Sequence, residues 1–388
     1  MGFIERKSYL IAILSRYPAA SRADKTKILD EFCAVCNYNR KYAIRILNRG
    51  PTIKKKRSGP KPVYQDQAIL DVLKKIWFAA DQPCSLKLIV IIPKWLPCYE
   101  EKYGAIEDEV KQKLLSISRS TIDRLLKPVR AKSKPKGQCT TKPSTFKTKI
   151  PVQMHHWDID KPGYVEADTV AHCGDSIAGK FAWSLTVTDL FTGWTENRAV
   201  WNKYSEGVYQ AVSFIEAALP FETLGFHSDN GSEFMNHIVY DYFTNRTKPV
   251  LFTRSRPYRK NDNAHVEQKN YTHVRQLLGY DRLDRKSVVY QMNELYRHEW
   301  SLYQNHFIPS VKLIYKERVG SRYKKIYDMP KTPYERVLES DFVDNKTKDK
   351  LRAIHRSLNP FTLKDEIERK LSVIFKNLKV TSNVRHRL

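Results

Sequence analysis

The sequence predicts a multidomain protein, with helical units in its first third and an α/β core behind them. Its 388 residues are enough for about two to four domains. Strand-like and helix-like segments alternate between residues 151 and 282. Residues 1–150 hold 32 basic and 13 acidic side chains, a net +19, whereas residues 151–280 hold 12 and 15, a net −3. This division indicates that the front of the chain binds a polyanion and that the middle performs chemistry.

The net charge of +26 favours a nucleic acid or a membrane surface as the partner. No stretch approaches about 18 consecutive apolar residues, so no transmembrane helix is expected. The first residues, MGFIERKSYLIAILSRYP, indicate a helix rather than a signal peptide. The sequence therefore favours nucleic acid over membrane.

Six scattered cysteines fit a reducing compartment. Cys33 and Cys36 have CxxC spacing but fall inside a helical pattern, and the first histidine of the chain is His155. A zinc site and a pair of buried thiols are the two alternatives, and the missing nearby histidines favour the thiols.

Residues 1–50 predict three helices: residues 3–16, a second beginning with Ser21 or Asp24 as its cap, and a basic third from Arg40 to Asn48. This order resembles a helix-turn-helix unit, in which Arg40, Lys41 and Arg45 would contact DNA. An ordinary three-helix bundle is the alternative.

Residues 51–66 form a basic linker, because proline and glycine break regular structure in PTIKKKRSGPKPV. The linker resembles an arm that lies in a minor groove, and the alternative is a solvated spacer. The KKKR run also matches a nuclear signal, but a DNA-contacting linker is simpler. Its candidate DNA contacts are Lys54, Lys55, Lys56 and Arg57.

A second helical unit is predicted over residues 67–130. Ser118 or Ser120 would cap its last helix, a second candidate recognition helix that carries Arg119, Arg124 and Lys127. Residues 131–150 contain no acidic residue and form a basic tether that can follow a DNA backbone.

Residues 151–282 predict three strands at 163–172, 180–191 and 194–200, and then a helix over 205–218. A strand at ETLGFHSD, a helix at MNHIVYDYF, a strand at PVLFTRS and a long helix over 261–279 follow. This is the element order of a ribonuclease-H-like α/β core with a five-stranded mixed sheet. Residues 283–388 predict a C-terminal domain with a small basic β-hairpin over 311–327 and amphipathic helices.

The stretch FHSDNGSEF places Asp229 where a strand ends. Asn-Gly is a strong turn signal, so a plain turn is one interpretation. The other is a carboxylate held at the rim of the sheet to bind a metal ion. Carboxylates on central strands and on an adjoining helix are the ligands that Mg²⁺ prefers, and two such ions about 3.5–4 Å apart serve phosphoryl transfer.

Five stretches resemble the transposases and integrases that have a retroviral-integrase-like core, and the insertion-sequence branch in particular. They are VEADTVAH, TVTDLFTGW, HSDNGSEF, RSRPYRKNDNAHVEQKN and FIPSVKLIYKERVGSRYKKIYDMPKTPYERVL. The resemblance covers about residues 150–340. It implies that Asp168, Asp229 and Glu267 are the catalytic residues and the ligands of two Mg²⁺ ions, for which Mn²⁺ substitutes.

On the helix of Glu267, retroviral integrases carry lysines that touch DNA ends. This chain has Tyr271 and Arg275 on that face and Lys269 off it. Lys269 and Arg275 are therefore candidate DNA contacts. The second spacing, between Asp229 and Glu267, is slightly longer here than in retroviral integrases, whose zinc-binding first domain is also missing.

Other acidic residues near these positions are considered as alternatives to Asp168, Asp229 and Glu267. Glu166 shares a strand face with Asp168, because residues i and i+2 point alike, and the family pattern favours Asp168. Asp158 and Asp160 precede the strand as loop residues. Asp189 matches a structural position. Glu233 is one helical turn past Asp229 and is expected to be exposed. His227 has a site-lining alternative, but a structural role is favoured for it.

The resemblance implies a DNA transposase. It binds the terminal inverted repeats of a mobile element, hydrolyses a phosphodiester at each end to free a 3′-OH, and joins that 3′-OH to target DNA. Its partners are double-stranded DNA and other copies of itself, as a dimer or tetramer on paired ends, in a bacterial cytoplasm at the nucleoid. Whether an accessory ATPase takes part does not follow from the sequence.

Two rival functions stay open. One is a non-catalytic DNA-binding regulator descended from such an enzyme, against which the intact set Asp168, Asp229 and Glu267 counts. The other is a simple metal-dependent nuclease. A sequence-reading N-terminal part counts against this second rival, because degradation needs no sequence address.

Overall fold

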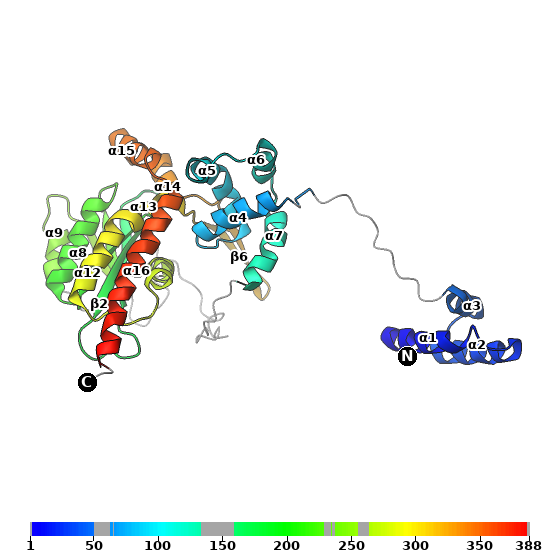
Figure 1. Ribbon diagram of the computed structural model, residues 1–388. Coiled ribbons are helices and arrows are strands. Elements are labelled where there is room, and N and C mark those ends of the chain that lie inside the picture. Colours follow the sequence, from blue (N-terminus) through cyan, green and yellow to red (C-terminus); the bar gives the residue numbers. More distant parts are fainter. Residues whose placement is uncertain are drawn as a thin grey trace. The chain divides into compact units, whose positions relative to one another are not determined.

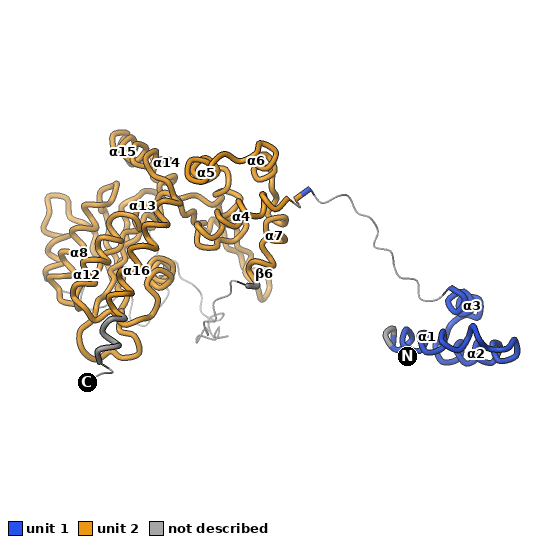
Figure 2. The backbone as a smooth tube through the Cα atoms, in the orientation of Figure 1, with its two compact units in different colours: residues 1–63 blue, residues 64–388 orange. Residues whose placement is uncertain are grey.

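The computed structural model describes residues 2–49, 63–64, 66–132, 159–228, 234, 237–254 and 264–385. The chain forms two compact units, residues 1–63 and residues 64–388, which are coloured separately in Figure 2. The basic linker over 51–62, most of the basic tether and Asp229 lie outside the described residues. No helix in the described ranges is long and apolar enough to cross a membrane.

The first unit consists of three helices at the positions that the sequence predicts: α1 (Phe3–Arg16), α2 (Arg22–Cys36) and α3 (Arg40–Arg49). Ser21 caps α2, because its side chain accepts a hydrogen bond from the backbone N–H of Asp24. Phe32 is fully buried at the centre of the small core, and Cys36 is buried beside it. Cys33 and Cys36 are free thiols on α2.

The second unit contains a five-stranded mixed sheet, consistent with a ribonuclease-H-like α/β core (Figure 1). The strands are β1 (Tyr164–Ala171), β2 (Ala182–Asp189), β3 (Thr195–Trp201), β4 (Gly225–Ser228) and β5 (Leu251–Arg254). Their order is β3-β2-β1-β4-β5. The first three strands are antiparallel, whereas β4 and β5 run parallel to β1.

The two faces of β1 differ in character because side chains alternate along a strand. Val165 and Ala167 are buried in an apolar cluster with α8 (Ser205–Ala218) and α9 (His237–Thr244). The intervening residues Glu166 and Asp168 face the other way and are paired with Thr188 and Thr186 of β2. The strand at the centre of the sheet therefore presents carboxylates on its polar face.

A helical segment crosses this polar face. It consists of α10 (Ala264–Lys269), a π-helical stretch η3 (Asn270–Arg275) and α11 (Gln276–Leu278), and it contacts β1 and β2. The sequence predicts a plain α-helix here, but the π-helical stretch inserts extra residues per turn and shifts which side chains face the sheet after Lys269.

Helices also cover the edge strand β3 of the sheet. They are α12 (Lys286–Leu295), η4 (Tyr296–Trp300) and α13 (Ser301–Phe307). The Asn293 amide pairs with the backbone of Ala199, and the Asn305 amide pairs with the backbone of Thr195. These amides satisfy groups that an edge strand otherwise leaves unpaired.

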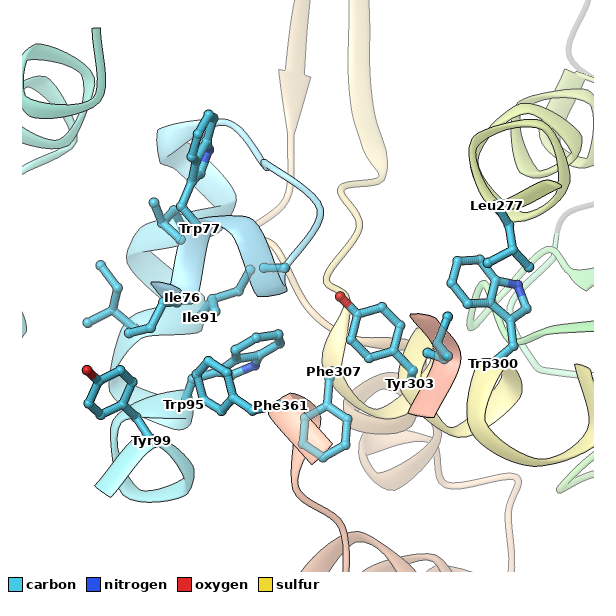
Figure 3. Packing of buried hydrophobic residues seen from close by; sticks show 14 of the residues in the cluster. Ile76, Trp77, Ile91, Trp95, Tyr99, Leu277, Trp300, Tyr303, Phe307 and Phe361 are labelled. Atoms are coloured by element: carbon cyan, nitrogen blue, oxygen red, sulfur yellow. The ribbon is translucent and has the colours of Figure 1, made fainter. Parts of the chain in front are cut away.

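The second predicted helical unit is present but shares its core with the C-terminus. It comprises α4 (Gln67–Ala79), α5 (Ser85–Tyr103), α6 (Asp108–Leu115) and α7 (Arg119–Lys132). Trp95 of α5 packs against Phe307 of α13 and against Phe361 at the start of α16 (Pro360–Arg385), as Figure 3 shows. Residues 67–132 and the C-terminal helix are therefore parts of one hydrophobic core.

Between the core and α16 the chain forms a two-stranded hairpin and two helices. The hairpin strands are β6 (Leu313–Val319) and β7 (Arg322–Tyr327), which pair antiparallel. The helices are α14 (Pro333–Glu339) and α15 (Asn345–Arg356).

Candidate active site

The register between the two central strands is described up to the residue before Asp168. β1 and β4 run parallel, with Ala167 opposite Ser228. Asp168 follows Ala167 directly, and Asp229 follows Ser228 directly in the sequence. Asp229 itself, with the predicted turn at Asn230 and Gly231, lies outside the described residues.

Asp168 is half-buried and is tied to the helix that crosses it. Its Oδ1 accepts a hydrogen bond from the backbone N–H of Thr169 at 2.7 Å, and its Oδ2 accepts one from the Asn270 side-chain amide at 2.7 Å. Asn270 is buried at the start of the π-helical stretch. The Asp168 carboxylate is thus oriented by a neutral donor three residues beyond Glu267.

Glu166 fixes the first turn of the same helix. Its side chain is buried, with 2% of the residue exposed, and its Oε2 accepts a hydrogen bond from the backbone N–H of Val266 at 3.1 Å. The backbone N–H of His265 is a second donor to this carboxylate. The first N–H groups of a helix have no partner within the helix, and Glu166 supplies one from the sheet.

The pKa of Glu166 is raised from 4.5 to about 7, chiefly by burial and to a smaller extent by the negative charges of Glu267 and Asp168, against the lowering effect of the two backbone donors. Glu267 therefore lies close enough to repel Glu166, although its own side chain is exposed on α10. Three carboxylates gather here: Glu166, Asp168 and Glu267. Sequence reasoning gave Glu166 no role, because its partner Val266 is 100 residues away in the chain.

The described residues include two of the three predicted metal ligands, Asp168 and Glu267. Within the described ranges, no group of three or more His, Cys, Asp or Glu side chains has the arrangement that could hold a metal ion. Carboxylate oxygens are nevertheless the donor type that Mg²⁺ prefers, and their mutual repulsion is relieved by a cation.

The two candidate DNA contacts on this helix point to backbone carbonyls. The Lys269 ammonium donates to the carbonyl of Gly193 at 3.3 Å, and burial, together with the charges of Lys87 and Arg336, lowers its pKa to about 7. The Arg275 guanidinium donates to the carbonyl of Ala171 at 3.0 Å.

Two of the residues that were considered beside the predicted ligands make hydrogen bonds within the fold. Asp189 is buried and accepts hydrogen bonds from the backbone N–H groups of Gly163 and Thr192 and from the Thr192 hydroxyl, at 2.6–2.8 Å. This confirms the structural role expected for Asp189. His227 is buried on β4, where its Nδ1 lies 2.8 Å from the Thr253 hydroxyl.

The candidate DNA contacts of the helical units occupy exposed positions. Arg40 forms an ion pair with Asp30, and the Arg45 guanidinium lies 5.0 Å from the centroid of the Tyr42 ring. Ser118 begins α7 by accepting a hydrogen bond from the backbone N–H of Thr121. The other exposed cations are Lys41, Arg119, Arg124 and Lys127. The linker candidates lie outside the described residues: Lys54, Lys55, Lys56 and Arg57.

No protein-family model matches this chain. Among solved structures, the chain is similar to the catalytic core domain of BIV integrase, with 17% sequence identity and a TM-score of 0.27 over 45% of this chain and 91% of that one. It is 38% identical over 341 residues to the uncharacterized protein y4rM of Sinorhizobium fredii (strain NBRC 101917 / NGR234). The match covers 85% of this chain and 94% of that protein. The chain therefore belongs to the same protein family as y4rM.

Proposed function

We propose that the protein is a DNA transposase or integrase. It binds the terminal inverted repeats of a mobile element, frees a 3′-OH at each end by hydrolysis, and joins that 3′-OH to target DNA. Asp168, Asp229 and Glu267 are the proposed catalytic residues. The observation that carries the proposal is the attachment of the helix of Glu267 to the carboxylate-bearing strand β1 through Glu166 and Asp168.

This attachment supports the choice of residues because it holds the residues on either side of Glu267 against the strand that carries Asp168. Glu166 binds the backbone at Val266, one residue before Glu267, and Asp168 binds Asn270, three residues after it. Asp229 follows Ser228 in the sequence, and Ser228 is paired with Ala167. We propose that Asp229 completes the set of three ligands.

A divalent cation fits this donor set, and we propose two Mg²⁺ ions, with Mn²⁺ as a substitute. The Glu166 pKa rises chiefly through burial and partly through the negative charges of Glu267 and Asp168, which supports the proposal of a cation beside these carboxylates. When bound, the ions stabilise the attacking and leaving oxygens of an in-line displacement at phosphorus.

The residues of the chain then divide into two groups. Asp168, Asp229 and Glu267 would hold the ions, and Glu166 and Asn270 would position the Asp168 and Glu267 carboxylates. Hydrolysis and joining are both displacements at phosphorus, so one site serves both, and no side chain needs to form a covalent intermediate.

Residues 1–150 would provide the sequence address, because they carry +19 of the +26 net charge and the exposed cations of α3 and α7. Phosphate contacts provide affinity and base contacts provide specificity. Because two ends must be joined together, a dimer or tetramer on paired ends is part of the proposal, as is a cytoplasmic location at the nucleoid.

A joining assay tests this function. The full chain is incubated with Mg²⁺, a duplex that carries the inverted repeat flanking its gene, and a target plasmid, and joined products are detected. We expect joining by the wild type and none by Asp168→Asn. Cleavage without joining would support a simple nuclease, and repeat binding without cleavage would support a regulator.

A further inference from the structure

The hairpin of β6 and β7 is exposed on both faces. All but one of the residues in its strands are exposed, and the exception, Lys316, is half-buried. A two-stranded hairpin is marginally stable in water, so it needs either a firm base or a partner. The hairpin also exposes more apolar surface than a solvated loop needs, with Ile314 68% exposed and Val319 58% exposed.

The base of the hairpin is firmly held. The Arg336 guanidinium of α14 binds the Asp328 carboxylate at 2.6 Å and the carbonyl of Ser310 at 3.0 Å. Asp328 also accepts a hydrogen bond from the backbone N–H of Lys312 at 2.6 Å. A β-bridge between Ser310 and Lys331 closes the base. The distal strands therefore project from a fixed root.

One face of the hairpin combines cations with an aromatic ring. Directly paired residues lie on the same face, and the register pairs Lys316 with Lys325 and Arg318 with Tyr323. The Lys316 ammonium lies 4.4 Å from the centroid of the Tyr323 ring. We name these four residues the basic face: Lys316, Arg318, Tyr323 and Lys325. It carries three positive charges and no acid.

The root of the hairpin lies beside the loop that the helix of Glu267 also contacts. The Lys312 ammonium lies 4.7 Å from the centroid of the Phe191 ring, in the β2–β3 loop. Gly193 in the same loop accepts the hydrogen bond from Lys269, two residues after Glu267. A duplex that enters the proposed active site would therefore pass close to this root.

We propose that the basic face binds the phosphate backbone of duplex DNA on its way to the active site. Residues 313–327 contain five basic residues and one acid, and the pair Lys316 and Lys325 places like charges opposite each other, which is unfavourable without a polyanion. A second copy of the same face would bring cations against cations. A two-stranded ribbon also fits a major groove, and seven residues span about 20 Å.

The inference rests on the proposed function, because that function identifies the DNA as an end of the mobile element or as its target. Its test is a salt titration of the full chain binding a duplex, in an Asp168→Asn background so that cleavage does not interfere. The variant is Lys316→Gln/Arg318→Gln/Lys325→Gln. The matched control is Lys346→Gln/Lys350→Gln/Lys376→Gln, which removes three exposed charges from α15 and α16.

Each lost phosphate contact reduces the slope of log affinity against log salt by about 0.9. We expect the hairpin variant to lose about 2 to 3 units of slope and at least about tenfold in affinity, and the control to keep the wild-type slope. Lys325→Gln alone should lose about 0.9, which checks the result if the triple variant fails to fold. An unchanged slope in a folded hairpin variant overturns the inference. An unchanged slope with an altered oligomeric mass would assign the face to a second copy.

The joining assay separates this inference from the proposed function. If the wild type joins no DNA and the hairpin variant still loses slope, the proposed function fails and the DNA-binding face stands. If the wild type joins DNA and the hairpin variant keeps its slope, the face is wrong and the function stands.

Discussion

Two groups of residues in the same sheet, each built around acidic side chains, have different surroundings. On β3, Glu196 is buried with the Arg198 guanidinium 3.2 Å away, and it also accepts hydrogen bonds from the Trp194 indole at 3.1 Å and the Ser301 hydroxyl at 2.6 Å. On β1, the partners described above for Glu166 and Asp168 are backbone N–H groups and the Asn270 amide. The first group contains its own cation.

Under the proposed function, this difference would separate a structural acid from a functional one. A buried carboxylate with a guanidinium and two neutral donors is satisfied and fixes α13 against β3. Glu166 accepts hydrogen bonds from backbone N–H groups, and burial, with smaller contributions from the negative charges of Glu267 and Asp168, raises its pKa to about 7. In the proposed function, the β1 carboxylates bind a cation that does not belong to the chain.

The largest effect is expected on catalysis. Asp168→Asn, Asp229→Asn and Glu267→Gln should each reduce cleavage and joining by at least about 1,000-fold while repeat binding persists, because each removes a proposed metal ligand. Product yields on gels and binding isotherms measure the two properties. A variant that keeps a tenth of wild-type cleavage removes its residue from the site. Glu166→Gln is the control, because its amide oxygen still accepts from Val266, and it should remain active.

The second largest effect is expected on stability and concerns the acid on β3. Glu196→Ala leaves the Arg198 guanidinium buried without its carboxylate, so the free energy of unfolding should fall by about 3 kcal/mol or more in denaturant titrations. Asp168→Asn should lose far less, because it removes a charge from a repulsive cluster. Equal losses would mean that the two groups are both structural.

The third effect is a pH dependence. The pKa of Glu166 is about 7 in the folded chain and 4.5 ordinarily, so the folded state binds more protons between these values. Stability is therefore lost as pH rises from about 4.5 to 7, by up to about 3 kcal/mol. Glu166→Gln lacks this titration. In chelator, the difference in unfolding free energy between variant and wild type should shift in favour of the variant by this amount between pH 4.5 and 8. A constant difference would contradict the burial of a charged Glu166.

The smallest effect concerns the amide that orients Asp168. Asn270→Ala should reduce joining by about 10- to 100-fold, because partners of metal ligands typically contribute that much. Asn305→Ala is the control variant. It removes a side-chain amide that pairs with the backbone of Thr195 on β3. That control should lower thermal stability and leave the rate per folded molecule unchanged. Equal effects on the rate would mean that Asn270 has no specific role.

The sequence predicts the elements of the core well, because local pattern determines them. The helix over 205–218 has the predicted bounds, and the first three strands lie within a few residues of their predicted positions. Among the candidate residues, Asp168 lies on the predicted strand and Glu267 on the predicted helix.

Contacts between distant segments could not be predicted in this way. The bond from Val266 to Glu166 spans 100 residues, and nothing local at Glu166 distinguishes a helix anchor from a second ligand. The packing of Trp95 against Phe361 joins a predicted separate unit to the C-terminus, because an apolar helix face does not specify what covers it. The π-helical stretch after Lys269 likewise has no composition signal.

Metal binding tests the central contrast most directly. Mn²⁺ binding is measured by calorimetry on the full chain, for the wild type, Asp168→Asn and Glu196→Gln. The account predicts that Asp168→Asn loses the binding and that folded Glu196→Gln keeps it, because only the β1 group uses its charge to hold a cation. Equal Mn²⁺ affinity in the wild type and Asp168→Asn would contradict the proposal that these carboxylates form a metal site.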